Sequence, residues 1–291
     1  MYRIEKVLNN NSILASKDNQ EVIFLGKGIG FGKKINDIYI PSDGVKKYKM
    51  ETKEQEKRLP HEIIRNVDPV FIEIASDIIR FAQEQFDHVD TKILLPLADH
   101  IDFAIKRIQE NVNMSNPFTK DIELLFPEEY KVALKGKQLI NSITGFEITE
   151  DEVGYITLHV HSAISTDHVG ESMQAMEIIH ESIDKLRKEL NIGIDRNSIS
   201  YIRLMNHIKY LLLRLNTEEK LQMDISDFTQ ERFPFAYERS KEICIRLSKV
   251  MKKEIPQSEI GYLALHLERI LSIELKSVSY THLTLPTTPY V

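Results

Sequence analysis

Most of this chain consists of one segment that is repeated at a fixed offset of 107 residues. Leu97–Ile101 aligns with Leu204–Ile208, and Glu152–His159 aligns with Glu259–His266. Because the offset is the same for both pairs, no net insertion separates the two copies. A period of this length exceeds the repeats of solenoid proteins and matches the usual size of an independent domain. The sequence therefore predicts two copies of one fold.

The two predicted copies span residues 64–170 and 171–277. Apolar residues of the first copy recur with the spacing of a helix face, and the second copy repeats the pattern. This face comprises Leu95, Leu97, Ile101, Ala104, Ile105 and Ile108. A further helix is predicted to begin at Thr149, because Glu152 three residues later completes a capping box. Both copies are therefore expected to contain these helices.

The composition is typical of a soluble protein with two or three domains. Of the 291 residues, 42% are hydrophobic and 28% are charged. The N-terminus lacks the apolar stretch of a signal peptide, and no membrane span is recognisable. The single cysteine, Cys244, lies in an apolar run, is expected to be a core residue and argues against a disulfide framework. These features predict a cytoplasmic protein without membrane insertion.

The N-terminal end differs from the rest in charge and pattern. Residues 1–50 hold nine Lys and Arg against five Asp and Glu, a balance of +4, whereas the whole chain carries −6. Short alternating segments between turn residues predict strands. The basic charge indicates a polyanion partner, although lysines on a solvated face would give the same balance. A sheet of about 50 residues buries little apolar surface alone, so it is expected to dimerise.

A glycine-rich loop follows the third predicted strand, with the sequence Gly26-Lys27-Gly28-Ile29-Gly30-Phe31-Gly32-Lys33-Lys34. Its spacing fits neither a Walker phosphate loop, in which Lys34 would have to be Ser or Thr, nor the dinucleotide pattern. No nucleotide cofactor is therefore expected. Glycines let the backbone approach a nucleic acid, lysines neutralise phosphates and an exposed Phe31 could stack on a base. The alternative is a hairpin that buries Phe31.

Four histidines occupy equivalent places in the two copies, namely His100, His159, His207 and His266. A histidine beside an apolar face is usually a packing residue, but Leu or Met would fill the same space without a polar atom to satisfy. Metal binding is disfavoured because the sequence holds no HExxH motif or Cys/His cluster. General base catalysis lacks an accompanying nucleophile. Acceptance of a phosphoryl group fits best, because a neutral imidazole is a competent nucleophile.

Arginines follow two of these histidines at a spacing of seven residues. Arg107 and Arg214 lie two helical turns after His100 and His207, on the same face. There they could hold a phosphate and lock a dimer interface, or they could simply extend along the surface. Phosphates that face each other across a two-fold axis would instead repel and open the interface.

The order of these features resembles the BglG/SacY family of transcriptional antiterminators. The resemblance is carried by Lys6-Val7-Leu8-Asn9-Asn10-Asn11, by the glycine-rich loop and by the duplicated histidine-bearing domains, and it is greatest for the glucose-type members. It implies a small all-β RNA-binding domain of the CAT type at residues 1–56, with a four-stranded sheet that dimerises. It also implies two homologous all-α helical bundles, the phosphotransferase-system regulation domains (PRDs), at residues 64–170 and 171–277.

The family's RNA-contact motif falls on residues of the N-terminal domain, and the resemblance implies the same role for them here. They are Lys6, Asn11, Gly26, Lys27 and Phe31, with Lys33 and Lys34 as neighbouring phosphate contacts. The family often has Arg at the position of Lys27. Lysine keeps the charge but loses the bidentate geometry, so Lys27 is expected to contact phosphate more than a base edge. Asn11 could read a base edge or only hold the turn after the first strand.

The resemblance further implies how the protein works and with what. It would bind a hairpin in nascent messenger RNA, the ribonucleic antiterminator, as a homodimer and prevent a terminator from forming. The PRD histidines would be phosphorylated by the general phosphocarrier HPr and by a sugar-specific enzyme II permease. Asp99 becomes Asn206 and His161 becomes Glu268 in the second copy, so the two domains are expected to have different phosphoryl donors.

Two other functions compete with antitermination. The first is an enzyme or histidine phosphocarrier, against which the missing nucleotide loop and substrate motif count. The second is a DNA-binding activator with the same regulation domains, which would need a helix-turn-helix where the sequence predicts strands. We expect no enzymatic activity, no cofactor and no metal. Residues 51–60 are predicted to be a charged linker, and residues 278–291 a disordered or foreign tail.

Overall fold

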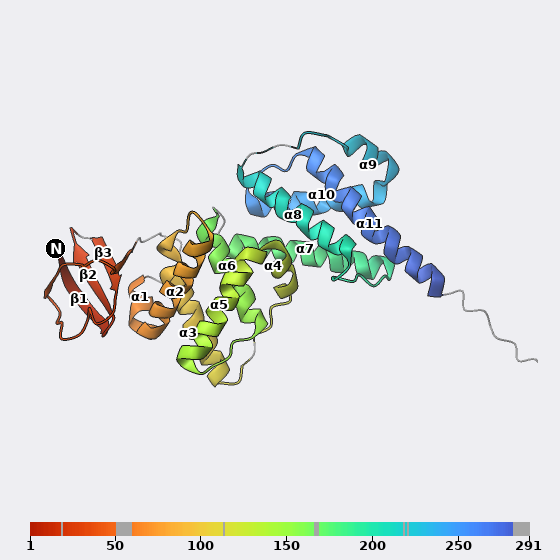
Figure 1. Cartoon of the computed structure of the whole chain (residues 1–291). Helices are drawn as coiled ribbons and strands as arrows, with labels where there is room; N and C mark the ends of the chain where they lie inside the picture. Colours follow the sequence, from red (N-terminus) through yellow and green to blue (C-terminus); the bar gives the residue numbers. More distant parts are fainter. Residues whose placement is uncertain are drawn as a thin grey trace, which may run out of the picture. The chain divides into compact units, whose positions relative to one another are not determined.

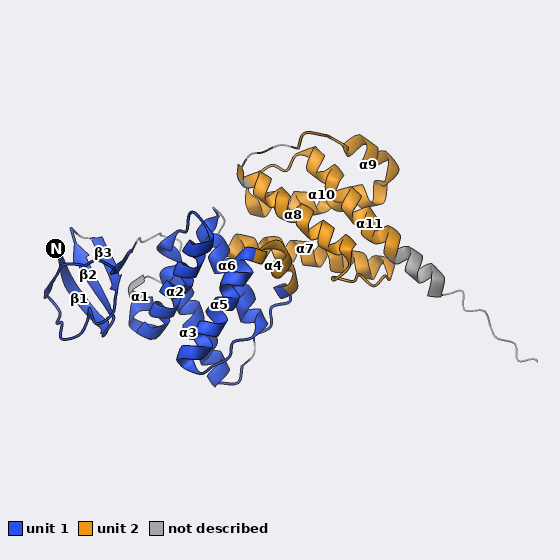
Figure 2. Ribbon diagram, viewed as in Figure 1, with its two compact units in different colours: residues 1–119, 128–167 blue, residues 120–127, 168–291 orange. Residues whose placement is uncertain are grey.

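The computed structural model describes residues 1–18, 20–50, 60–112, 114–165, 169–217, 219 and 221–281. Strands come first and helices follow (Figure 1), which confirms the predicted order of a small antiparallel sheet and a helical region. The chain forms two compact units (Figure 2): residues 1–119 with 128–167, and residues 120–127 with 168–291. None of the described helices is long and apolar enough to cross a membrane.

The N-terminal sheet is antiparallel, with strand order β4-β1-β2-β3-β5. Asn10 and Asn11 form the turn between β1 and β2, which pair from Arg3 opposite Ser16 to Asn9 opposite Ser12. Four strands have four or more residues, as expected, and a fifth strand of two residues adds one edge beside β1. The strands are β1 Tyr2–Asn9, β2 Ser12–Lys17, β3 Gln20–Leu25, β4 Ile38–Tyr39 and β5 Lys46–Lys49.

Successive side chains of a strand point to opposite faces of the sheet. Both faces of this sheet carry buried apolar side chains. One face carries the cluster of Ile4, Ile13, Ala15, Val22, Phe24 and Tyr39. The other face carries Leu14, Ile23, Leu25 and Tyr48, which pack into the core that helices α1 (Pro60–Asn66) and α2 (Pro69–Gln85) begin. The Tyr48 hydroxyl lies 2.7 Å from Ser76 Oγ on α2. Helices of the same chain therefore cover one apolar face of the sheet.

The helices of the two copies follow the same plan. Three helices of the first copy, α4, α5 and α6, begin 107 residues before α9, α10 and α11. The first copy contains α2, the 3-10 turn η1 Thr91–Ile93, α3 Leu94–Gln109, α4 Thr119–Leu125, α5 Pro127–Thr144 and α6 Glu150–Ile164. The second contains α7 Val169–Leu190, α8 Ile199–Thr217, α9 Ser226–Arg232, α10 Pro234–Met251 and α11 Gln257–Thr281. The internal duplication is thus a duplication of tertiary structure.

Local signals in the sequence explain several helix boundaries. The predicted cap of α6 is confirmed, since the Thr149 side chain accepts a hydrogen bond from Glu152 N. Helix α2 begins in the same way at Asp68, which accepts from Val70 N. Helix α11 ends at Thr281, so the first four residues of the predicted tail are helical. The linker at 51–59 and residues 282–291 lie outside the described residues.

Glycine inside helices α6 and α11 has a packing explanation in the second copy. Glycine in a helix interior costs about 1 kcal/mol relative to alanine. At Gly261, a Cβ atom would lie 2.9 Å from Ser226 Cα and 3.0 Å from Ser226 N at the start of α9. Only the missing side chain allows α11 and α9 to approach this closely.

We expect Gly261→Ala to lower the free energy of unfolding by about 1–3 kcal/mol, because the added methyl group must push two backbones apart. Thermal unfolding of the full chain measures this change. Gly170→Ala is the matched control, since a Cβ at Gly170 in α7 meets no atom within 4 Å. Equal melting temperatures for the two variants would contradict the close helix approach.

Candidate functional sites

The first pair of predicted histidines comes together where α3 meets α6. His100 lies on α3 and His159 on α6, and their ring centroids are 5.3 Å apart. Tyr155, one turn before His159, places its ring centroid 5.6 Å from that of His100. Residues far apart in the sequence thus form one cluster, because the apolar faces of the two helices pack against each other.

The second copy repeats this arrangement between α8 and α11. The ring centroids of His207 and His266 are 5.0 Å apart, and the rings lie at an interplanar angle of 29°. The centroid of Tyr262 lies 6.1 Å from that of His207. The structure therefore brings the four predicted histidines together as two pairs, one in each copy.

A buried carboxylate lies beside each histidine pair, and sequence reasoning assigned no separate role to it. In the first copy, Glu152 Oε1 accepts a hydrogen bond from Arg107 Nη2 at 2.7 Å. The other oxygen, Oε2, lies 3.1 Å from His100 Nε2, without the alignment of a hydrogen bond. Burial alone would raise the pKa of Glu152, but His100 and Arg107 outweigh it and hold this pKa below its usual value. The carboxylate is therefore ionised at neutral pH.

Glu259 plays the same part in the second copy with a stronger arginine contact. Arg214 donates from Nε at 2.6 Å and from Nη2 at 2.8 Å to the two oxygens of Glu259. This bidentate pairing is a strong form of ion pair. His207 Nε2 lies 3.6 Å from Glu259 Oε2. Neither arginine extends freely along the surface, as one reading of the sequence proposed; each neutralises a buried acid.

Three ring nitrogens of these histidines have no hydrogen-bond partner among the described residues. They are Nε2 of His100, Nε2 of His207 and Nδ1 of His266, and all three are buried. Buried polar atoms are nearly always paired, so unpaired nitrogens at equivalent places in two copies call for an explanation. An imidazole nitrogen with a free lone pair can act as a nucleophile, and one with a proton can hydrogen-bond an incoming group.

The surroundings keep His159, His207 and His266 uncharged at neutral pH. Burial, reinforced by neighbouring His100, lowers the pKa of His159 from 6.5 to about 3. Burial also lowers the pKa of His207 from 6.5 to about 3, and His266 and Arg214 add to the effect. The pKa of His266 is lowered as well, first by burial. A neutral ring is the nucleophilic form of histidine, so the environment favours acceptance of an electrophilic group.

The copies differ at a second histidine, as the sequence indicated. His161 Nδ1 lies 3.0 Å from Glu129 Oε1 on α5, which is buried. At the equivalent places the second copy has Glu268 and the buried Ala236. The second copy therefore lacks both the buried acid and its histidine partner. This joint loss is expected, because burial of a carboxylate without a partner is energetically unfavourable.

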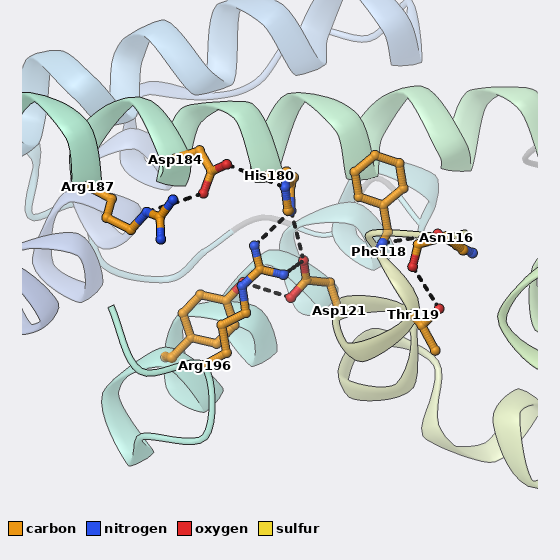
Figure 3. A network of polar contacts seen from close by, with 9 residues as sticks. Asn116, Phe118, Thr119, Asp121, His180, Asp184, Arg187 and Arg196 are labelled. Atoms are coloured by element: carbon orange, nitrogen blue, oxygen red, sulfur yellow. Dashed lines mark hydrogen bonds and ion pairs between the residues drawn. The ribbon is translucent and has the colours of Figure 1, made fainter. Parts of the chain in front are cut away.

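A polar network in the second unit involves a histidine that the sequence reasoning did not select. His180 on α7 lies with Asp184 of the same helix, Asp121 of α4 and Arg196 of the segment before α8 (Figure 3). Arg196 Nη2 donates to His180 Nδ1 at 2.9 Å, and Arg196 Nη1 donates to Asp121 Oδ2 at 3.4 Å. The Tyr201 hydroxyl donates to Asp121 Oδ1 at 2.7 Å. These bonds satisfy a fully buried carboxylate and hold α4 in this unit.

The glycine-rich loop of the sheet is held by backbone contacts that need glycine. Gly28 has a φ of +73°, a conformation that other residues rarely adopt. A Cβ at Gly30 would lie 2.1 Å from Asn9 O, so the loop packs directly on the β1–β2 turn. Asn11 links the two, because its Oδ1 accepts from Gly28 N at 2.9 Å and its carbonyl accepts from Gly26 N at 2.9 Å.

The candidate RNA-contact residues fall into an open group and an occupied group. Phe31 is 75% exposed, which contradicts the alternative of a hairpin that buries it. The open group also contains Lys27, Lys33 and Lys34. In the occupied group, Lys6 Nζ donates to Ile64 O at 3.2 Å and Asn11 Nδ2 donates to Glu73 Oε2 at 3.3 Å. The structure thus gathers these residues around one turn and loop, with part of the set engaged by helices α1 and α2.

Metal ligands and the thiol are the remaining reactive groups in the described part of the chain. No group of three or more His, Cys, Asp or Glu side chains there could hold a metal ion. Cys244 is buried, as the sequence predicts, and burial raises the pKa of its thiol to about 12. A thiol with this pKa is not a nucleophile at neutral pH.

Comparison with known proteins identifies each part of the chain. The CAT RNA-binding domain family matches residues 2–57, and the PRD domain family matches residues 72–163 and 180–270. Proteins named GlcT from Staphylococcus aureus strains RF122 / ET3-1 and JH9 are each 32% identical over 273 residues, covering 91% of this chain and 95% of the relative. A crystal structure of GlcT CAT-PRDI is 38% identical, covers 56% of this chain and 98% of its own, and aligns with a TM-score of 0.49.

We expect the buried histidines to make folding sensitive to acid. Unfolding returns the pKa of His207 from about 3 to 6.5, so below pH 6.5 the unfolded chain binds a proton that the folded chain does not. The free energy of unfolding should therefore decrease as the pH is lowered from 6.5 to 4, by at most roughly 1.4 kcal/mol per pH unit for this residue. His207→Gln should flatten this dependence, as measured by urea unfolding across that pH range.

The control for this acid dependence is His88→Gln, since His88 is exposed. It should leave the dependence on pH unchanged. A steeper loss of stability in His207→Gln than in the wild type would contradict a neutral, buried His207.

Proposed function

Because the chain belongs to the BglG/SacY family of transcriptional antiterminators, we propose that it binds a hairpin of nascent messenger RNA as a dimer under the control of histidine phosphorylation. The family assignment rests on matched CAT and PRD domains and on relatives aligned over almost their whole length. The chain is therefore a regulator and not an enzyme. The observation that carries the proposal is the pairing of histidines with buried, unsatisfied ring nitrogens in both PRDs.

The RNA-binding part of the proposal relies on the open group of loop residues. Phe31 offers an exposed aromatic face on which a base can stack, and three lysines lie near it in the sequence. Lys27, Lys33 and Lys34 supply the positive charge that a phosphate backbone requires. The rival DNA-binding activator would need a helix-turn-helix, whereas residues 1–18 and 20–50 form strands and turns.

The regulatory part relies on the charges around each histidine pair. A phosphoryl group on His100 or His207 adds roughly two negative charges next to a carboxylate that is already ionised. Glu152 or Glu259 would be repelled, while Arg107 or Arg214 could turn from the carboxylate to the phosphate. Phosphorylation would therefore rearrange the helix contact that joins the pair.

The membership of the BglG/SacY family suggests the partners of this reaction. The phosphoryl donors would be phosphorylated HPr and a sugar-specific enzyme II permease, with glucose as the sugar, in the cytoplasm. The His161–Glu129 contact exists in the first PRD alone, which supports different donors for the two domains. A dimer would couple the switch to RNA, because phosphates that face each other across a two-fold axis repel and those that meet arginines attract.

We expect Phe31→Ala in the full chain to weaken specific hairpin binding by about 1–3 kcal/mol, through the loss of one stacking contact. Ile35→Ala is the matched control, since Ile35 is another exposed apolar residue, 61% exposed, that lies outside the proposed contacts. Fluorescence anisotropy measures the affinity for a hairpin enriched from a random RNA pool on the wild-type chain. Equal affinity for this hairpin and a scrambled one would refute the RNA-binding part.

We expect incubation of the full chain with phosphorylated HPr and the permease to place phosphate on His100, His159, His207 and His266. Their imidazole nitrogens are candidate nucleophiles, and mass spectrometry at alkaline pH maps the label. In a reporter strain, His100→Ala or His159→Ala should permit antitermination without sugar, because the inhibitory charge can no longer be added.

The exposed His88 is the control for phosphorylation. His88→Ala should leave expression dependent on sugar. Label on His88 in place of the four paired histidines would show that accessibility, and not the PRD site, decides the reaction.

A further inference from the structure

The turn between β1 and β2 is bound by an acid of helix α2. Asn9 Nδ2 donates to Glu73 Oε1 at 2.6 Å, and Asn11 Nδ2 donates to Glu73 Oε2 at 3.3 Å. Both oxygens of one carboxylate are thus used by one turn. In the same region, Lys6 Nζ donates to the backbone carbonyl of Ile64 in α1 at 3.2 Å. Two candidate RNA-contact residues therefore have partners from the helices.

The contacts of Asn11 are of the kind that RNA would use. A carboxylate presents acceptor oxygens, as a phosphate or a base edge does, and an asparagine amide donates to either. Asn11 also holds the glycine-rich loop through its Oδ1, which accepts from Gly28 N at 2.9 Å. The side chain of Asn11 is therefore engaged at both ends, and a base or phosphate could reach its amide only by displacing Glu73.

Besides the contact of Glu73 with the turn, other contacts join the sheet to α2. Lys46 Nζ donates to Ser76 Oγ at 3.1 Å and lies 3.3 Å from Asp77 Oδ1. The apolar face of the sheet, including Leu25 and Tyr48, packs into the same core as α1 and α2. Glu73 and Asp77 also place negative charge against the basic domain, where it would repel a nucleic acid.

The contacts with α1 and α2 involve only part of the proposed RNA surface. Phe31, Lys27, Lys33 and Lys34 remain exposed while Lys6 and Asn11 are engaged. RNA could therefore meet the loop first, but it could complete its contacts only after the turn leaves α2.

We propose that the docking of the β1–β2 turn on Glu73 is an autoinhibitory contact, in which α1 and α2 of the first PRD compete with RNA for Asn11 and Lys6. This proposal rests on the RNA-binding role proposed above. It gives the first PRD a direct means of control over RNA binding, because α2 belongs to the same compact unit as the α3–α6 histidine pair. A docked population of about nine in ten would lower the apparent RNA affinity about tenfold.

The test compares RNA affinities of the full-length wild type, Glu73→Ala and Glu84→Ala, using the enriched hairpin and its scrambled form. Glu84 is the matched control, because it lies on the same helix and carries the same charge but pairs with Arg80 at 2.7 Å and not with the sheet. We expect Glu73→Ala to bind the hairpin about five to ten times more tightly than the wild type. Glu84→Ala should bind like the wild type.

A second variant protects the test against misfolding of the first. Asp77→Asn removes the charge that Lys46 contacts and should also tighten hairpin binding, by a smaller factor. Hydrogen exchange should show faster exchange at the β1–β2 turn in Glu73→Ala than in Glu84→Ala, with α3 and α6 unchanged.

The outcomes separate this proposal from the RNA-binding role. If the wild type binds the hairpin specifically and Phe31→Ala weakens it, but Glu73→Ala binds equally or more weakly, the masking is refuted and RNA binding stands. An equal gain in Glu73→Ala and Glu84→Ala would mean a general charge effect and would refute the masking too. If no variant prefers the hairpin to the scrambled RNA, both proposals are refuted.

Discussion

The ion pair between a buried glutamate and an arginine organises each helical copy. Glu152 and Glu259 are almost wholly buried, and a buried carboxylate is strongly unfavourable unless charge and hydrogen bonds compensate it. Arg107 and Arg214 provide that compensation from the neighbouring helix, at 2.7 Å and 2.6 Å. The pair thereby links the helices that carry the histidines, and it places the negative charge that a phosphate on the histidine would meet. Structure and proposed regulation thus depend on the same two groups.

The first long helix of each copy, α2 or α7, binds a segment that does not belong to that copy: the N-terminal sheet for α2 and helix α4 for α7. On α2 and α7, polar residues at equivalent places form a row with the spacing of one helix face, namely Glu73, Asp77 and Arg80 in the first copy and His180, Asp184 and Arg187 in the second. The row on α2 binds the sheet, through Glu73 and Asp77. The row on α7 binds α4, through His180. The duplication therefore preserved a docking surface while the docked segment changed.

Sequence reasoning succeeded where a signal is local or repeated. The four paired histidines were found from their common offset, and the start of α6 from the capping residue Thr149. It was incomplete where a side chain has two plausible environments. The sequence positions of Arg107 and Arg214 fit surface residues as well as functional ones, because nothing near them in the sequence identifies Glu152 and Glu259 as partners. His180 and Glu73 were not selected at all, since an acid or a histidine on a helix is usually a solvated residue.

The sequence by itself determined the order of domains, the helical and strand-like character of each and the equivalence of the two copies. Periodicity, capping and repeat spacing are properties of neighbouring or aligned residues, so they can be read along the chain. Only the tertiary structure decided which face of the sheet is covered by α1 and α2, and that Asn11 meets Glu73 across 62 residues of sequence. Such pairings depend on how whole surfaces fit together, because each contact alone is too weak to specify its partner.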